Sequence, residues 1–436
     1  MSAPSPCAGG RCRPPHVTTG AATRHRERRA PAARPRTPSA RRRGPRSSDS
    51  TWTTGPGGAV DEVEDVRVEV PQGDLDDLHE RLDRTRWPDR EPVGGWSQGV
   101  PLDVVRAWCR SWRHEHDWRA TEQRLNRVPQ VVTEVDGVRV HALHARSARP
   151  DATPLVLTHG WPGSFLEFEE CLPLLTHPPA GDPAFHVVVP SVPGYGFSAR
   201  PTTTGWDVHR IARAWCALMT RLGYPRFLAA GSDWGTSIST SIALQHPERL
   251  VGLHLVPPLA APDRGASPRT DAERRALADL DERTATGSAY SEVHRTRPQT
   301  LGYGLCDSPA ALAAWVGEKL WLWSDRTAGG LRLDQVLDDL SLYWLTATGA
   351  SSARLYWESI GEVSAWFTSG TGEAVDVPTG CSVFPAEVPR PSRRWAERRF
   401  TRIVHWGEPP RGGHFAAWEQ PALFAAELRA TRRAIG

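Results

Sequence analysis

A carboxylate occupies the centre of a sharp turn that is typical of a nucleophile. Residues 231–235 read Gly-Ser-Asp-Trp-Gly, with Asp233 in the middle. The apolar run 226–230 before them predicts a buried strand, and residues 237–244 after them predict a helix. Glycines on both sides let the backbone turn tightly and let the helix pack close to the strand. The turn therefore presents the Asp233 side chain between the end of a strand and the start of a helix.

Asp233 predicts attack on a saturated carbon. A carboxylate is ionised at neutral pH, so it needs no base to activate it. Attack on an electrophilic sp³ carbon forms an ester, and the ester keeps a carbonyl that water can attack later. Epoxides and alkyl halides are the substrates that suit this chemistry. A serine esterase built on Ser232 is the alternative, but that nucleophile would not be flanked by the two glycines.

The glycine-flanked turn is the nucleophile elbow of α/β-hydrolases, in which the acid and the histidine follow the nucleophile in that order. His414 lies in a glycine-rich loop, residues 411–415, between the last predicted strand and the last predicted helix. That position suits a general base. His405 falls within the strand itself and is expected to be structural. Glu387 follows the preceding predicted strand, where a carboxylate would orient the His414 imidazole and stabilise its cation.

An oxyanion hole needs two backbone N–H groups directed at the ester oxygen. We expect one from Trp234, the residue after the nucleophile. The other is expected from Trp161, in the turn His159-Gly160-Trp161-Pro162 that follows a predicted buried strand. His159 itself is expected to be a structural residue of that turn.

Strands alternate with helices along most of the chain, which predicts an α/β fold with a mostly parallel, doubly wound sheet. The predicted strands are 66–70, 155–158, 185–189, 226–230, 250–256, 377–384 and 402–405, with a hairpin in 131–144. The alternation stops near Pro257, and residues 271–362 have a helical pattern with many aromatic side chains. Such an insertion predicts a helical cap over the active site.

These patterns divide the chain into five expected parts. Residues 1–58 are expected to be a disordered tail, because a composition rich in arginine and proline cannot bury enough apolar surface to fold. The other parts are an N-terminal domain, 63–135, the first half of the hydrolase core, 136–258, the cap, 259–375, and the second half of the core, 376–436. The N-terminal domain is small and lacks a complete core of its own, so it is expected to pack on the part that follows it.

Composition limits which classes of binding partner and which cellular compartment we expect for this protein. The formal net charge is +3, but residues 1–50 hold twelve arginines against Glu27 and Asp49, so the remainder is mildly acidic and unsuited to nucleic acid. The seven cysteines have no paired spacing, which predicts free thiols in a cytoplasmic compartment and no zinc site. No apolar run is long enough for a membrane anchor. The oligomeric state stays open.

Taken together, the motifs resemble those of the microsomal-type epoxide hydrolases, which include the juvenile-hormone epoxide hydrolases. The matching stretches are 159–164 (HGWPGS), 193–198 (PGYGFS), 231–235 (GSDWG) and 411–417 (RGGHFAA). Trp87-Pro88 and Asp117-Trp118-Arg119 are similar to the N-terminal domain that this family adds and that wraps the hydrolase domain. The resemblance covers about residues 63–433.

Carried onto this sequence, the resemblance implies Asp233 as the nucleophile, His414 as the base and Glu387 as its partner. It also implies that two cap tyrosines, Tyr290 and Tyr356, protonate the opening epoxide oxygen, although the residues alone leave packing roles open for both. The implied substrate is an apolar epoxide, with no cofactor and no metal. Animal members of the family carry an N-terminal membrane anchor, where this chain has a polar, arginine-rich stretch.

We therefore expect an epoxide hydrolase that forms a vicinal diol through a covalent aspartyl ester. A haloalkane dehalogenase is the first alternative, because it shares the aspartate elbow and the histidine, and Trp161 and Trp234 offer N–H groups to a halide. The paired tyrosines and the N-terminal domain argue against it. The second alternative is a non-catalytic binding protein of the same fold, which would usually lack one of the five catalytic side chains.

Overall fold

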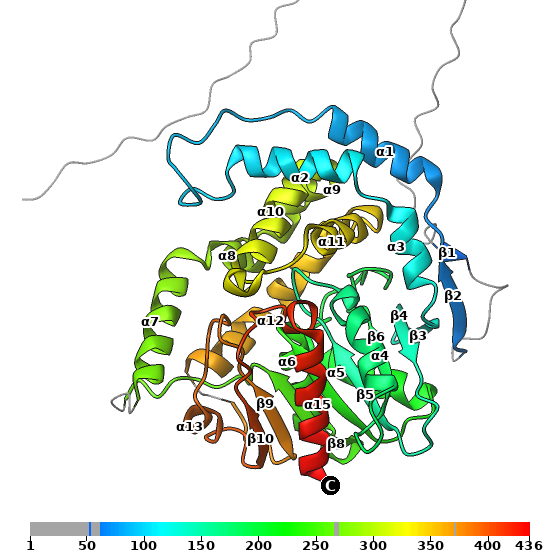
Figure 1. Ribbon diagram of the computed structural model, residues 1–436, viewed down its shortest axis with the longest axis vertical. Helices are drawn as coiled ribbons and strands as arrows, with labels where there is room; N and C mark the ends of the chain where they lie inside the picture. The colour runs from blue at the N-terminus through cyan, green and yellow to red at the C-terminus, as the bar shows by residue number, and fades with distance from the viewer. Residues whose placement is uncertain (1–51, 54–61, 266–269, 370–371) are drawn as a thin grey trace, which may run out of the picture. The chain divides into compact units, whose positions relative to one another are not determined.

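The computed structural model describes residues 52–53, 62–265, 270–369 and 372–436. The described strands are β1 (Trp52–Thr53), β2 (Glu64–Val68), β3 (Gln130–Val135), β4 (Val138–Ala145), β5 (Thr153–Thr158), β6 (Phe185–Pro190), β7 (Phe227–Ser232), β8 (Leu250–Val256), β9 (Thr379–Ser382) and β10 (Ile403–Gly407). They form a sheet in the order β1-β2-β3-β4-β6-β5-β7-β8-β9-β10 (Figure 1). Strands from β6 to β10 in this order pair in parallel, and the pairs from β1 to β6 are antiparallel. The predicted α/β fold with a mostly parallel sheet is confirmed.

The central strands are buried on both faces. Strand β7 consists entirely of buried residues, and β6 reads Phe-His-Val-Val-Val-Pro. Such nearly continuous apolar runs are typical of parallel strands that helices cover on both sides. Helix α15 (Pro421–Ile435) packs over β8, β9 and β10, while α5 (Val208–Arg221) and α6 (Trp234–Gln245) pack together on the other face (Figure 1). The elbow thus joins a central strand to one of the covering helices.

The antiparallel part of the sheet begins before the hydrolase core. Asp136 and Gly137 have φ angles of 53° and 75°, so the predicted turn joins β3 and β4 as a hairpin. At the outer edge, Trp52 pairs with Val68, and Thr53 pairs with Arg67. The expected disordered tail of residues 1–58 therefore does not hold for these two residues, because main-chain pairing at a sheet edge does not require an apolar sequence. The rest of that tail lies outside the described residues.

A block of helices is inserted between β8 and β9, where the sequence predicted a cap. Its members are α7 (Asp271–Thr286), α8 (Ala289–Thr296), α9 (Pro298–Asp307), α10 (Pro309–Leu322), α11 (Leu333–Leu345) and α12 (Gly349–Thr368). Helix α12 packs on α8 and α9, and α10 packs on α11. The Tyr195 hydroxyl, which belongs to a core loop, donates to the Ser352 carbonyl of α12 at 2.9 Å. This bond ties the cap to the core.

The N-terminal helices cover the cap. They are α1 (Gln72–Asp83), α2 (Leu102–His114) and α3 (Trp118–Leu125), and they contact α10 and α11 (Figure 1). In α2, residues at helical spacing bury one face, and the indole of Trp112 donates to Ser341 Oγ at 2.7 Å. The N-terminal part therefore wraps the cap and also adds β2 and β3 to the sheet.

Short helices complete the described chain. They are α4 (Leu172–Thr176), α13 (Arg393–Ala396), α14 (Ala416–Glu419) and the 3₁₀ turns η2 (Phe165–Cys171), η3 (Pro247–Arg249) and η4 (Arg326–Ala328). Across the described ranges, we find no helix that combines the length and the apolar character needed to cross a membrane.

Candidate active site

The turn after β7 holds Asp233 in a strained backbone conformation. Its φ is 50° and its ψ is −121°, which a residue with a side chain rarely adopts. A Cβ at Gly235 would lie 1.9 Å from the Thr158 carbonyl oxygen, and one at Gly231 would lie 2.5 Å from Gly235. The two glycines are therefore required by close backbone contact, as the sequence predicted. Strain of this kind exposes a nucleophile at the tip of an elbow.

Asp233 contacts both the expected oxyanion donor and the expected base. The Trp161 backbone N–H donates to Asp233 Oδ1 at 2.8 Å, and His414 Nε2 lies 3.5 Å from Asp233 Oδ2. A Cβ at Gly160 would lie 2.1 Å from Asp233 Oδ1, so the carboxylate lies directly against this backbone. Trp234, the second expected donor, begins α6 next to the nucleophile.

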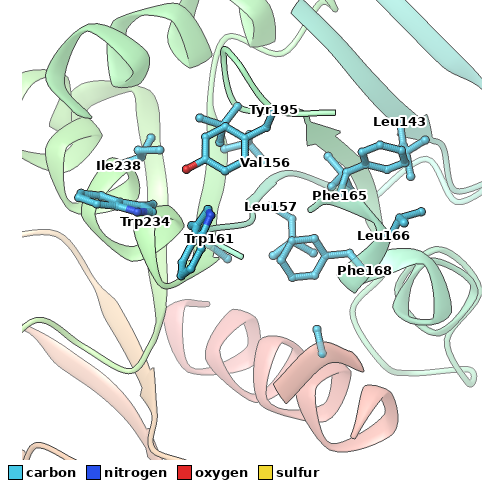
Figure 2. Close-up of a cluster of buried hydrophobic side chains, with 14 of the residues drawn as sticks. Leu143, Val156, Leu157, Trp161, Phe165, Leu166, Phe168, Tyr195, Trp234 and Ile238 are labelled. Carbon is cyan, nitrogen blue, oxygen red and sulfur yellow. The ribbon is translucent and has the colours of Figure 1, made fainter. Parts of the chain in front are cut away.

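Packing fixes the two tryptophans around Asp233. Figure 2 shows Trp161 and Trp234 in the cluster of buried side chains that also holds Tyr195 and Phe165. Trp161 is 1 % exposed and Trp234 is 3 % exposed. Because these side chains are buried, the backbone N–H groups of both residues belong to a rigid part of the core. Rigid donors need no reorganisation when charge develops on an oxygen.

Glu387 orients His414. The two carboxylate oxygens lie 2.9 and 3.0 Å from His414 Nδ1, which leaves Nε2 directed at Asp233. Burial lowers the pKa of His414, but the carboxylates of Glu387 and Asp233 outweigh burial and raise that pKa to about 10. The imidazole is therefore protonated at neutral pH.

The two expected cap tyrosines line the same cavity as Asp233. Tyr290 lies on α8 and Tyr356 on α12, and their ring centroids are 5.8 Å apart. Trp161 stacks on Tyr290 at 5.2 Å and meets Tyr356 edge-on at 5.8 Å. The Tyr356 hydroxyl hydrogen-bonds to that of Tyr290, and burial raises the pKa of both phenols. Both hydroxyls are therefore protonated at neutral pH.

A cavity of about 210 Å³ joins these groups. Its reactive lining consists of Asp233, Glu387, His414, Tyr290 and Tyr356. Its apolar wall includes Leu259, Leu280, Ile360, Val363 and Phe367. The carboxylate, the imidazole and the two phenols thus meet in one largely apolar chamber. In the part of the chain that the structure describes, no group of His, Cys, Asp or Glu side chains could hold a metal ion.

The family models match along this architecture. Residues 63–168 match the epoxide hydrolase N terminus, and residues 153–297 match the α/β-hydrolase fold. A protein of Stigmatella aurantiaca whose name assigns it to the epoxide hydrolases is 49 % identical over 83 % of this chain and 83 % of its own. Epoxide hydrolase 1 of Oryctolagus cuniculus is 33 % identical, with 87 % of this chain and 91 % of the relative covered. The chain belongs to the epoxide hydrolase family.

Solved epoxide hydrolases share the fold. The Aspergillus niger epoxide hydrolase superposes with a TM-score of 0.78 at 31 % identity, covering 85 % of this chain and 96 % of that chain. The juvenile hormone epoxide hydrolase of Bombyx mori superposes with a TM-score of 0.80 at 26 % identity, covering 86 % and 95 %.

Two histidines and one tyrosine make structural contacts in this member of the epoxide hydrolase family. His405 lies on β10 with its Nε2 2.7 Å from Glu427, as expected of a strand histidine. His159 Nε2 accepts from the Val192 N–H at 3.1 Å, which fits the structural role predicted for it. The Tyr343 hydroxyl donates to the Gly163 carbonyl at 3.1 Å. None of these three side chains lines the cavity described above.

Ser232 points away from the chemistry. Its Oγ donates to Glu167 Oε2 at 3.4 Å, and the serine is buried. Glu167 is itself 2 % exposed, and burial raises its pKa well above the ordinary value. The sequence did not single out Glu167, although an acidic residue between Phe165 and Phe168 in a buried turn was a usable signal. The geometry disfavours Ser232 as a nucleophile.

The loop that carries His414 is held by two carboxylates that the sequence analysis also missed. Glu419 accepts from the Gly413 N–H at 3.1 Å, and Asp325 accepts from the Gly412 N–H at 2.9 Å. The N–H of His414 itself donates to the Trp323 carbonyl at 2.9 Å. Because Trp323 and Asp325 follow a cap helix, the cap takes part in placing His414. A carboxylate five residues after the histidine was the available signal.

Proposed function

We propose that this chain hydrolyses an apolar epoxide to a vicinal diol through a covalent ester on Asp233. The observation that carries the proposal is the cavity in which Asp233, the His414–Glu387 pair and the two phenols face one another. Membership of the epoxide hydrolase family supports it, as do the names of its relatives. Each group has a task that its position suits.

In the first step, an Asp233 oxygen attacks one epoxide carbon, and the bond from that carbon to the epoxide oxygen breaks. The freed oxygen takes a proton from a tyrosine, so an alkoxide does not accumulate. The products of this step are a hydroxyalkyl ester of Asp233 and a tyrosinate. His414 remains protonated during the attack, because both carboxylates still face it.

Ester formation prepares the base for the second step. It removes the negative charge of Asp233, which is one of the two charges that raise the pKa of His414. The imidazolium then releases its proton, and this proton replaces the one that the tyrosine gave up. The neutral imidazole can now accept a proton from water, and Glu387 stabilises the cation that results.

Hydrolysis closes the cycle. Water gives one proton to His414, and its hydroxide adds to the ester carbonyl, where the N–H groups of Trp161 and Trp234 would stabilise the oxyanion. Collapse breaks the bond between the carbonyl carbon and the alkyl oxygen, and that oxygen takes the remaining proton of the attacking water. The diol leaves, and the Asp233 carboxylate and the protonated His414 are restored.

The experiment that tests this function uses His414→Gln. Alkylation needs no base, whereas hydrolysis does, so this variant should accumulate a protein adduct when it is mixed with an epoxide such as styrene oxide. Intact-mass spectrometry should show a gain equal to the whole epoxide, because ring opening expels nothing. Peptide mapping should place the gain on Asp233, and the double variant with Asp233→Ala should show none. His405→Gln is the matched control and should turn over without accumulating adduct.

Two results would contradict the proposal. The first is the absence of an adduct in a His414→Gln variant that still binds the substrate. The second is an adduct on Ser232. Halide release from chloroalkanes or bromoalkanes, with no diol from epoxides, would instead support a haloalkane dehalogenase. The indole Nε1 of Trp234 is a buried donor with no partner among the described atoms, so this alternative has a candidate halide donor.

A further inference from the structure

Lys319 is the single lysine of the sequence, in which arginine supplies every other basic side chain apart from histidine. It lies on α10 and is buried, with 7 % of the residue exposed. Its ammonium lies 5.0 Å from the centroid of the Tyr290 ring and 2.8 Å from Glu318 Oε2. The lysine ammonium is a compact point charge on a flexible stem. The lysine therefore places a buried positive charge against one of the two phenols.

A second cation reaches the same phenol. Arg283 of α7 lines the cavity, and its guanidinium hydrogen-bonds to the Tyr290 hydroxyl. The guanidinium also donates to the Val388 carbonyl and lies 4.8 Å from the centroid of the Trp323 ring. These contacts hold Arg283 against Tyr290. Burial raises the pKa of Tyr290, but the Arg283 charge opposes that rise.

Tyr356 has a different environment. Its ring is enclosed by Trp234 at 4.8 Å, His294 at 4.9 Å and Trp161 at 5.8 Å. Burial, Tyr290 and the Asp233 charge are the strongest influences on the Tyr356 pKa, and each raises it. The two phenols are thus unequal, since the cations act on Tyr290.

The groups that face Tyr290 come from five places in the fold. Arg283 and Lys319 are positive, Asp233 is negative, and Tyr356 donates a hydrogen bond. His294 is one turn after Tyr290 on α8, and burial together with the Lys319 charge lowers its pKa to about 3. It is therefore neutral, and its Nε2 accepts from the Trp315 indole at 3.0 Å. Glu318 faces Lys319 and partly offsets its charge.

We propose that Lys319 and Arg283 make Tyr290 the principal proton donor in ring opening, while Tyr356 supports it with a hydrogen bond. This inference rests on the epoxide-opening function proposed above. A tyrosine that gives up its proton becomes an anion, and a cation beside it stabilises that anion. The attraction between a nearby cation and the ring also becomes stronger when the ring becomes more electron-rich. Lys319 and Arg283 do not meet the substrate oxygen in this scheme and act as positioning residues through Tyr290.

The test is a double-mutant cycle on the alkylation step. Every variant carries His414→Gln, so the adduct accumulates and its rate of formation can be followed by rapid-quench mass spectrometry with styrene oxide. Lys319→Met should slow alkylation about tenfold, which corresponds to about 1.4 kcal/mol of transition-state stabilisation. Lys319→Arg restores the charge and should recover part of the rate. The alkaline limb of the rate should move to higher pH in Lys319→Met, because Tyr290 becomes a weaker acid.

The cycle separates an electrostatic role from a structural one. In a Tyr290→Phe background, Lys319→Met should have almost no further effect, whereas in the matched Tyr356→Phe background it should retain its full effect. An equal loss in both backgrounds, or no loss in either, would overturn the inference. If Lys319→Met does not fold, Arg283→Gln allows the same cycle from the cavity side. If the parent variant His414→Gln forms no adduct, the proposed function is contradicted. If the parent forms the adduct but Lys319→Met has no effect in any background, this inference alone is contradicted.

Discussion

Three cap tyrosines interact electrostatically with Asp233, and their hydroxyls have different partners. Tyr290 and Tyr356 line the cavity and hydrogen-bond to each other. The Tyr343 hydroxyl donates to the Gly163 carbonyl and supports the turn that carries Trp161. The residues alone left packing roles open for Tyr290 and Tyr356, because a position in the sequence does not show which side of a helix faces the cavity.

Removing both cavity phenols should stop ring opening. In the double variant Tyr290→Phe with Tyr356→Phe, the oxygen would leave as an unprotonated alkoxide, so we expect a loss of at least about 100-fold in the alkylation rate. Single-turnover diol formation and adduct formation would measure it. Tyr343→Phe is the matched control and should alkylate nearly as fast as the parent. Wild-type alkylation in the double variant would exclude these phenols from the chemistry.

The sequence could predict the residues whose neighbours in the chain define their geometry. Asp233 has its glycines beside it, and His414 and Glu387 follow from the order of the strands. Glu167 was missed because its position depends on packing between elements that are distant in sequence, and Arg283 was missed because the turn between α7 and α8 decides whether its side chain reaches Tyr290. Arg283 reaches Tyr290 from the preceding cap helix, and Glu167 reaches Ser232 from the turn after β5.

At the scale of elements, one carboxylate joins the N-terminal helices to the cap. Asp338 on α11 is buried and accepts from Thr121 at 2.5 Å and from Arg124 at 2.6 Å. His116 Nε2 lies 2.8 Å from the same carboxylate. Periodicity predicted the helices on both sides of this contact, but no pattern within either one predicts that they meet. Burial favours the neutral form of Asp338, but hydrogen bonds from His116 and Thr121 outweigh burial and lower its pKa.

Asp338→Ala should therefore destabilise the protein. It leaves three buried or half-buried polar partners without their carboxylate, which should lower the free energy of unfolding by about 3 kcal/mol. Because the folded pKa lies below the ordinary value of 3.8, this stabilisation is present above that pH and is lost as the pH falls through the folded pKa. Urea unfolding of the variant and the wild type should give curves that converge at acid pH.

A matched control for that prediction lies one turn earlier on the same helix. Asp334 pairs with Arg332 at 3.2 Å, and both side chains are more than half exposed. Exposed pairs of this kind contribute little, so Asp334→Ala should change the free energy of unfolding by less than about 1 kcal/mol. Equal losses from the two variants would show that Asp338 does not act through its buried partners.

At the scale of the whole molecule, the alternation of strands and helices was enough to predict the sheet and the cap. The hairpin predicted in 131–144 already crossed the expected boundary at residue 135, but the sequence did not predict that β2 joins the same sheet. Strand β2 pairs with β3, and β3 pairs with β4, so the sheet continues across the expected boundary at residue 135. The boundary at residue 135 marks only where the sequence pattern changes. Backbone pairing can continue across it, because the edge strand of a sheet has free N–H and C=O groups.

Two truncations test where the folded molecule begins. Residues 1–50 have a composition that cannot contribute to a core, so their removal should leave both the melting temperature and the alkylation rate unchanged. Removal of residues 1–61 also deletes β1 and uncovers the edge of β2 at Arg67 and Val68. That second truncation should lower the melting temperature by a few degrees and promote self-association, because an unpaired edge offers its N–H and C=O groups to other chains.

Alkylation should survive in both truncated proteins, since β1 lies at the far end of the sheet from Asp233. Differential scanning calorimetry and size-exclusion chromatography would measure the two effects, and a loss of activity on removing residues 1–50 would show that this stretch takes part in the enzyme.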